Sequence, residues 1–278
     1  RMLWLLGFGL AHFYFIWFGD ILSGYALLGL ILYFFRNMAP RRLIVVGGIL
    51  IVVQLLFFLG ITFAAGMLRE AATAPRPDPK AMIEWQEMTE QFGALSAQGL
   101  ADKLSLFHGP YSGLVRDRLI ERAAEPFTSL LFFGWETLAY MLFGMAALKT
   151  GFFRGKWRAL DYFKVAVVGF AITVPAYALL AWILASDGFG IPVQFAVGLA
   201  ATVPFRPLMV LAYAALIILL ARRTGWLTAR LAAAGRAAFT NYLGTSIVMT
   251  TLFYGYGVGL YGTMNRAELW LVVLPMWA

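Results

Sequence analysis

Residues 43–68 form an apolar run of 26 residues without an Asp, Glu, Lys or Arg. As an α-helix it would extend about 39 Å at 1.5 Å per residue, which exceeds the roughly 30 Å hydrocarbon core of a bilayer. A helix that is apolar on every side must be buried in a large core or in lipid. Residues 43–68 therefore predict a transmembrane helix.

Composition extends this prediction to the whole chain. Hydrophobic residues make up 62% and charged residues 13%, whereas about a quarter of a typical soluble domain is charged. The apolar residues come in several blocks of helical length, so the expected fold is all-α, a polytopic transmembrane helical bundle with a small helical extracytoplasmic insert. The chain starts and stops inside apolar runs, so both ends are expected to be parts of longer helices.

Seven spans are predicted. The first two are short and meet at Gly19-Asp20 as a tight helical hairpin without a loop. The sixth is interrupted by Pro204-Phe205-Arg206-Pro207 and is read as one crossing. The predicted spans cover residues 2–18, 21–35, 43–68, 127–148, 164–185, 191–221 and 234–256, and a last, truncated helix begins at residue 268.

Residues 69–125 differ in composition from the rest, because they hold 16 of the 36 charged residues. Asp78 and Pro79 predict a helix start, with an acidic N-cap and proline in the first turn, and this helix is expected to end at Gly93. Two further short helices are expected before residue 125. The predicted organisation is residues 1–68 with transmembrane helices one to three, the insert at 69–125, and residues 126–278 with transmembrane helices four to seven, the last truncated.

The formal charge of +8 is distributed between the apolar blocks and does not form one basic face. It therefore predicts membrane topology and no nucleic-acid partner. With residues 191–221 crossing once, one side collects most of the Lys and Arg, and the insert falls on the other side. The insert is therefore expected to face outward. Membrane lipids are the expected partners, and a homo-oligomer is left open.

Several common chemistries find no support. The chain has no cysteine, which excludes disulfides and a thiol nucleophile, and no cluster of metal ligands or phosphate-binding loop is visible. The stretch from Gly257 to Gly262 matches G-x-G-x-x-G, but it follows a predicted membrane helix and not a strand. It is interpreted as a helix terminus and turn.

Three ionisable residues are candidate catalytic groups: His12, Glu136 and Asp20. His12 is about 17 Å beyond Arg1 along a helix and Glu136 about 14 Å beyond Phe127, so both are expected near the bilayer midplane. Ionisable groups there mark a site, a pathway or an internal pair. His12 suits a general base; the alternative is a histidine that only bonds a neighbouring helix.

The expected depth in the bilayer also determines which carboxylate should pair with His12. Glu136, at similar depth, is the preferred carboxylate partner of His12, unless it is a protonated structural acid bonded to Tyr140. Asp20 is expected at the outer rim as the cap of the second helix, and the second histidine, His108, as a loop residue.

A second group of candidates lies at the basic end of the span at 234–256. Arg236, Thr240, Asn241 and Tyr242 fall on adjacent faces of one predicted helix, and a buried Arg and Asn would offer donors to a phosphate, carboxylate or oxyanion. These four are the predicted donor or substrate-binding residues. The alternative is ordinary hydrogen bonding between helices.

Three stretches together resemble one family. GLAHFYFIWFGDILSGYALLG, YMLFGMAALKTGFFRGKW and GRAAFTNYLGTSIVMTTLFYGYGVGLYG, in this order, resemble the YeiB-like bacterial inner-membrane proteins, whose biochemical role is not settled. That family is similar at fold level to the transmembrane acyltransferase superfamily, which uses a membrane-buried histidine and acyl-CoA from the cytoplasmic side. The resemblance implies acyl-CoA as a possible donor substrate and identifies no cofactor. It also implies the bacterial cytoplasmic (inner) membrane as the location, with the insert at 69–125 on the outer side.

Three functions therefore compete. The first is acyl transfer to a small, lipid or sugar acceptor, with His12 as base. The second is a small-molecule transporter or exporter, in which the broken helix at residues 204–207 moves. The third is a scaffold or accessory subunit whose polar residues only hold the bundle together.

Overall fold

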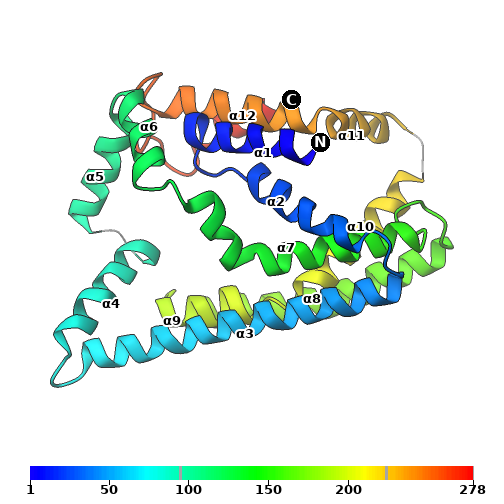
Figure 1. Cartoon of the computed structure of the whole chain (residues 1–278), viewed down its shortest axis with the longest axis horizontal. Coiled ribbons are helices and arrows are strands. Elements are labelled where there is room, and N and C mark those ends of the chain that lie inside the picture. The colour runs from blue at the N-terminus through cyan, green and yellow to red at the C-terminus, as the bar shows by residue number, and fades with distance from the viewer. Residues whose placement is uncertain (94–95, 223–224, 278) are drawn as a thin grey trace. The chain divides into compact units, whose positions relative to one another are not determined.

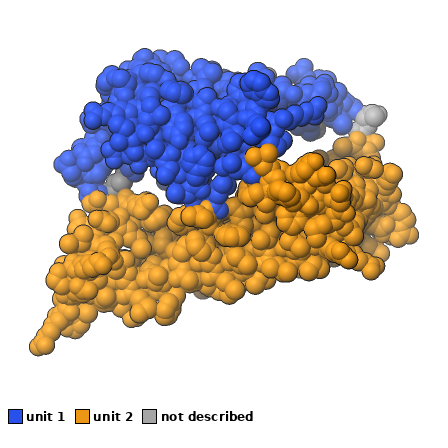
Figure 2. All heavy atoms as spheres, viewed as in Figure 1, with its two compact units in different colours: residues 1–27, 96–130, 225–278 blue, residues 28–95, 131–224 orange. Residues whose placement is uncertain are grey.

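The computed structural model describes residues 1–93, 96–222 and 225–277. Over these residues the chain is helical, without strands, and Figure 1 shows the helices in order along the chain. The all-α prediction is confirmed. Contacts divide the chain into two compact units, coloured separately in Figure 2. Unit 1 holds residues 1–27, 96–130 and 225–278, and unit 2 holds residues 28–95 and 131–224.

Unit 2 contains the long apolar helices. Its elements are the end of α2 (Leu22–Leu32), η2 (Tyr33–Phe35), α3 (Pro40–Thr73), α4 (Pro79–Phe92), most of α7 (Glu125–Lys149), α8 (Ala159–Ser186), α9 (Ile191–Val193), the π-helix η3 (Gln194–Ala201) and α10 (Arg206–Ala221). Figure 1 shows α3 and α8 as long helices. On α3 the apolar side chains of Val45, Leu56 and Phe63 are exposed, as expected for a helix that faces lipid.

Close packing in unit 2 depends on small residues. Gly169 of α8 lies against Ala212 of α10, and a Cβ at position 169 would collide with the Ala212 methyl group. Helices approach closely in membranes when one side of the contact is glycine or alanine. On the other side of the unit, Phe58 of α3 is buried against Ala200 and Val203. These contacts hold α3, η3, α8 and α10 together.

Three helices, α3, α7 and α8, are long and apolar enough to cross a membrane by themselves. The pair α9–η3 and α10 would make a fourth span, bent by 52° at its break. These match the predicted spans at 43–68, 127–148, 164–185 and 191–221. The total of seven spans stays a prediction. The helical segments Met2–Ile16 and Leu22–Phe35 have only 10–17 residues, and α12 (Ala238–Phe253) has 16, so each is shorter than a bilayer core.

The polar segment at 69–125 forms the expected short helices. Asp78 accepts a hydrogen bond from the Lys80 amide as the N-cap of α4, which ends before Gly93 as predicted. Helix α4 packs on α3 and α9, where Trp85 and Met88 cover Ala65. The other two helices, α5 (Ala97–His108) and α6 (Tyr111–Ile120), belong to unit 1.

Unit 1 gathers segments that are distant in sequence. Its other elements are α1 (Met2–Ala11), the π-helix η1 (His12–Ile16), the start of α2, the start of α7, α11 (Trp226–Arg236), α12 and α13 (Trp270–Trp277). The core around Phe107, Leu114 and Tyr254 joins α5, α6 and the end of α12. The turns after α12 confirm that the G-x-G-x-x-G match is a helix terminus, with Gly259 at φ +78°.

Candidate functional site

The first two helices are separated by a short loop and not by a two-residue turn. Helix α1 changes to π-helix at His12, and the chain becomes extended at Trp17, with φ −150° and ψ 129°. Helix α2 starts at Leu22. π-Helical turns are uncommon and occur frequently at functional sites. The loop from Trp17 to Ile21 brings Asp20 back beside the end of α1.

This fold pairs His12 with Asp20. Nδ1 of His12 lies 3.0 Å from Oδ1 of Asp20, and both side chains are completely buried. Oδ2 of Asp20 accepts a hydrogen bond of 2.8 Å from the Ser23 amide. The expectation that Asp20 caps the second helix is therefore met, while the expectation that His12 and Asp20 are not partners was wrong. It assumed one straight helix up to Phe18, which would hold the two side chains apart.

The close approach of α1 and α2 requires glycine at position 9. A Cβ there would lie 2.9 Å from Oδ2 of Asp20 and would also overlap the Ser23 backbone nitrogen. Tyr242 of α12 covers the pair from another side, since its ring centroid lies 4.9 Å from that of His12. Its hydroxyl accepts from the Ile21 amide at 3.2 Å and lies 3.4 Å from Oδ1 of Asp20.

The second ring nitrogen of His12 has no partner. Among the described residues no hydrogen bond reaches Nε2, although the side chain is 1% exposed. Because an ionised carboxylate only accepts hydrogen bonds, Nδ1 must carry the proton that it shares with Asp20. In a neutral ring Nε2 then presents a free lone pair. The arrangement is that of an oriented general base.

Asp20 is held in its charged form. Burial raises the pKa of the Asp20 carboxyl, but hydrogen bonds from His12 and from the Ser23 amide outweigh that effect, so its pKa lies below the ordinary value of 3.8. A carboxylate that accepts several hydrogen bonds from donors favours ionisation in this way.

Glu136 has other partners, so its predicted pairing with His12 was wrong. Arg206 donates to Oε2 of Glu136 at 2.7 Å, and the Tyr140 hydroxyl donates to Oε1. The alternative of a bond to Tyr140 is thus confirmed. Gln54 of α3 accepts a hydrogen bond of 3.3 Å from the Glu136 amide. Glu136 is the centre of a separate polar network inside unit 2.

Arg206 is a polar residue that sequence reasoning treated only as part of a helix interruption. Its guanidinium donates to the Thr202 hydroxyl and to the carbonyl oxygens of Gly198 and Leu199 at the end of η3. The Thr202 hydroxyl also donates to these two carbonyl oxygens, so Arg206 and Thr202 together bond the backbone at the break. An arginine between two prolines in an otherwise apolar run was the available signal.

The predicted donor-binding group is only partly assembled. Helix α11 ends at Arg236 and α12 starts at Ala238, so a break at Ala237 separates Arg236 from Thr240. Arg236, Thr240 and Asn241 are exposed, and the expected buried Arg and Asn are not found. The continuous helical periodicity of the sequence hid this break. Tyr242 alone reaches the His12 pair. His108, at the end of α5, bonds the Tyr261 carbonyl oxygen through Nε2 at 2.7 Å.

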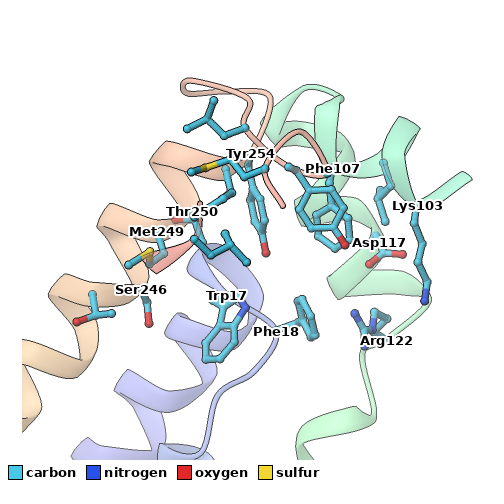
Figure 3. A pocket seen from close by; sticks show the side chains of 18 residues that line it. Trp17, Phe18, Lys103, Phe107, Asp117, Arg122, Ser246, Met249, Thr250 and Tyr254 are labelled. Carbon is cyan, nitrogen blue, oxygen red and sulfur yellow. The ribbon is translucent and has the colours of Figure 1, made fainter. Parts of the chain in front are cut away.

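A cavity of about 760 Å³ lies in unit 1 near this pair. Figure 3 shows Met249, Ser246 and Thr250 of α12 on one side and Lys103, Asp117 and Arg122 on the other. Trp17 lines the cavity and meets the His12 ring edge-on, with ring centroids 6.2 Å apart. Among the described residues no group of three or more His, Cys, Asp or Glu is arranged to hold a metal ion.

These features define a polytopic helical membrane protein with an internal His–Asp pair. The model of a family of unknown function, DUF418, matches residues 147–278. The uncharacterized protein YeiB of Escherichia coli (strain K12) is 29% identical over the whole chain, which covers 67% of YeiB. The uncharacterized protein YxaH of Bacillus subtilis (strain 168) is 28% identical over the whole chain, which covers 64% of YxaH.

These matches support the resemblance to the YeiB-like proteins. It spans about two thirds of the length of these two curated relatives. No solved structure matches the chain, so the expected likeness to transmembrane acyltransferases remains an expectation.

Proposed function

We propose that the protein transfers an acyl group from a cytoplasmic acyl-CoA to a small, lipid or sugar acceptor, with His12 as general base. The observation that carries the proposal is the buried His12 ring with Nδ1 on Asp20 and a free Nε2. A histidine that served only to bond a neighbouring helix would satisfy both ring nitrogens when buried, because an unpartnered polar atom costs free energy.

The proton transfers follow from this geometry. Nε2 of His12 takes the proton from the acceptor hydroxyl or amine as that atom attacks the thioester carbonyl carbon. The carbon–sulfur bond then breaks, and the same proton passes from Nε2 to the leaving thiolate to give free CoA. Asp20 stabilises the protonated ring in between and fixes its orientation. Tyr242, packed on the ring, prevents rotation of His12 away from Asp20.

The proposed location is the bacterial inner membrane, with residues 69–125 on the outer side. Support comes from charge: Arg36, Arg41, Arg42 and Lys149 flank the cytoplasmic ends assigned to α2, α3 and α7, in agreement with the positive-inside rule. Lys149 also connects the end of α7 to the loop between η2 and α3, because its ammonium group donates to the carbonyl oxygens of Arg36 and Met38.

Purified protein in nanodiscs, incubated with radiolabelled acetyl-CoA and a panel of membrane lipids and sugars, tests the proposal. General-base catalysis contributes about a hundredfold to ten-thousandfold, so His12→Gln should reduce transfer by this order and Asp20→Asn should reduce it less. His108→Gln is the matched control and should leave transfer unchanged. Absence of transfer and of acetyl-CoA hydrolysis, or activity that is insensitive to His12→Gln, would overturn it.

Transport is the second candidate function, and one observation favours it. The ion pair between Glu136 and Arg206 lies at the break between η3 and α10, inside a span bent by 52°. Broken helices with polar groups at a break are typical of transporter substrate sites. Proteoliposome flux that disappears in Glu136→Gln while His12→Gln retains it would support transport over acyl transfer. A protein in which both variants change only stability would be a scaffold.

A further inference from the structure

We infer that the cavity of unit 1 binds an amphiphilic anion, a ligand with one negatively charged head group and one hydrocarbon chain. The inference does not depend on the proposed acyl transfer, because it uses only the cavity, its lining and the charges around it. Free fatty acids and anionic phospholipids share this chemistry.

The shape and lining of the cavity fit a hydrocarbon chain. Its volume of about 760 Å³ is within the range of about 300–1,000 Å³ for small-molecule sites. Most of the lining is apolar and comes from Phe18, Phe107, Met249, Leu260 and Leu269. The Ser246 and Thr250 hydroxyls on this wall already donate to backbone carbonyls of their own helix, so they present little unsatisfied polarity to a chain.

Positive charge collects at one side of the cavity. Figure 3 shows Lys103 and Arg122 together at the α5–α6 side, away from the α12 wall. Lys103 makes no ion pair within the described residues. The Arg122 Nε bonds Glu125 at 2.7 Å, and its guanidinium lies 4.5 Å from the Phe18 ring centroid. The cavity therefore has a cationic end and an apolar end.

Arg118 is a buried arginine outside the lining that adds positive charge near the cavity. Its side chain is 2% exposed, and neither Nη1 nor Nη2 has a hydrogen-bond partner among the described residues. Its guanidinium carbon lies 6.0 Å from the ring centroid of Tyr254, which lines the cavity. The acidic residue acting on this guanidinium is Asp117, and the field of a buried charge is weakly screened inside the protein.

The charges nearest the cavity leave a cationic surplus. Lys103, Arg118 and Arg122 contribute three positive charges, against Asp117 in the lining and Glu125 on Arg122. An anion at this end would gain from the surplus, whereas a neutral or cationic ligand would not. Charge complementarity thus selects an anionic head group.

The test measures binding of a dansyl-labelled fatty acid to the protein in phosphatidylcholine nanodiscs. Saturable binding is expected, with displacement by unlabelled palmitate and not by the corresponding fatty alcohol. A hydrogen bond to a charged group is worth about tenfold in affinity, so Lys103→Gln and Arg122→Gln should each weaken binding by about that factor. Arg118→Gln should also weaken it. Arg116→Gln, an exposed arginine outside the lining, is the charge control.

A second pair of variants tests the position of the site. Met249→Trp, which fills the cavity, should abolish binding, while Val248→Trp on the exposed face of the same helix should retain it. Displacement by short-chain phosphatidylglycerol and not by palmitate would identify a phospholipid as the source. Equal displacement by the alcohol, or equal affinity of the Gln variants and the Arg116→Gln control, would overturn the inference.

Discussion

Breaking the Glu136–Arg206 ion pair is expected to destabilise the bundle strongly. Arg206→Met removes the 2.7 Å contact with Glu136, leaves that carboxylate with Tyr140, and removes the guanidinium hydrogen bonds to the Gly198 and Leu199 carbonyls. The side chains are 25% exposed for Arg206 and 8% for Glu136. Removing one partner of a buried pair costs about 3–5 kcal/mol, and the partial exposure of Arg206 places the expected loss near 3 kcal/mol at the low end.

The double variant makes the prediction specific. Replacing both partners by apolar side chains leaves no unpaired charge, so Glu136→Leu combined with Arg206→Met should be at least about 1 kcal/mol more stable than the sum of the two single effects predicts. Reversible unfolding in mixed micelles, followed by circular dichroism, measures the free energies. Arg154→Met, an exposed arginine without a bonded side chain, is the control. Additive single and double effects would refute this account of the pair.

Three further predictions concern other contacts. The pKa of Asp20 is lowered in the folded protein. The stability that the ionised carboxylate contributes is therefore present above about pH 4 and is lost as the pH falls through the lowered value. Thermal melts from about pH 6 to 3 should show this loss of stability, and Asp20→Asn should abolish the pH dependence. Gly9→Ala should destabilise the protein, whereas Gly7→Ala should not, because a Cβ at position 7 meets nothing within 4 Å; parallel melts compare them. Lys149→Met should increase amide hydrogen exchange at residues 36–38, since it uncovers two carbonyls, and unchanged exchange would contradict that role.

The long spans could be predicted because their signal is local. The apolar run at 43–68 and the N-cap at Asp78 determine helices by their own composition, and the structure places α3 and α4 there. The ends of the shorter helices could not be predicted, because apolar composition does not reveal where a helix ends. The segments Met2–Ile16 and Leu22–Phe35 are as apolar as the longer helices, yet each is short.

The partners of His12 and Glu136 could not be predicted, since they depend on contacts between distant segments. Depth along ideal helices suggested that these two residues pair, but the π-helical turn at His12 and the extended residue Trp17 redirect the chain to Asp20. Arg206 reaches Glu136 across 70 residues of sequence. The His12–Asp20 and Arg206–Glu136 contacts both depend on irregular backbone, which hydrophobic periodicity does not reveal.

The tautomer of His12 tests the central claim most directly. In a His108→Gln background His12 is the only histidine, so nitrogen-15 NMR of histidine-labelled protein in nanodiscs reports on this ring alone. We predict that at alkaline pH the neutral His12 ring carries its proton on Nδ1 and leaves Nε2 unprotonated. Asp20→Asn should remove this preference for the Nδ1–H tautomer. A ring protonated on Nε2 in the unsubstituted site would contradict it.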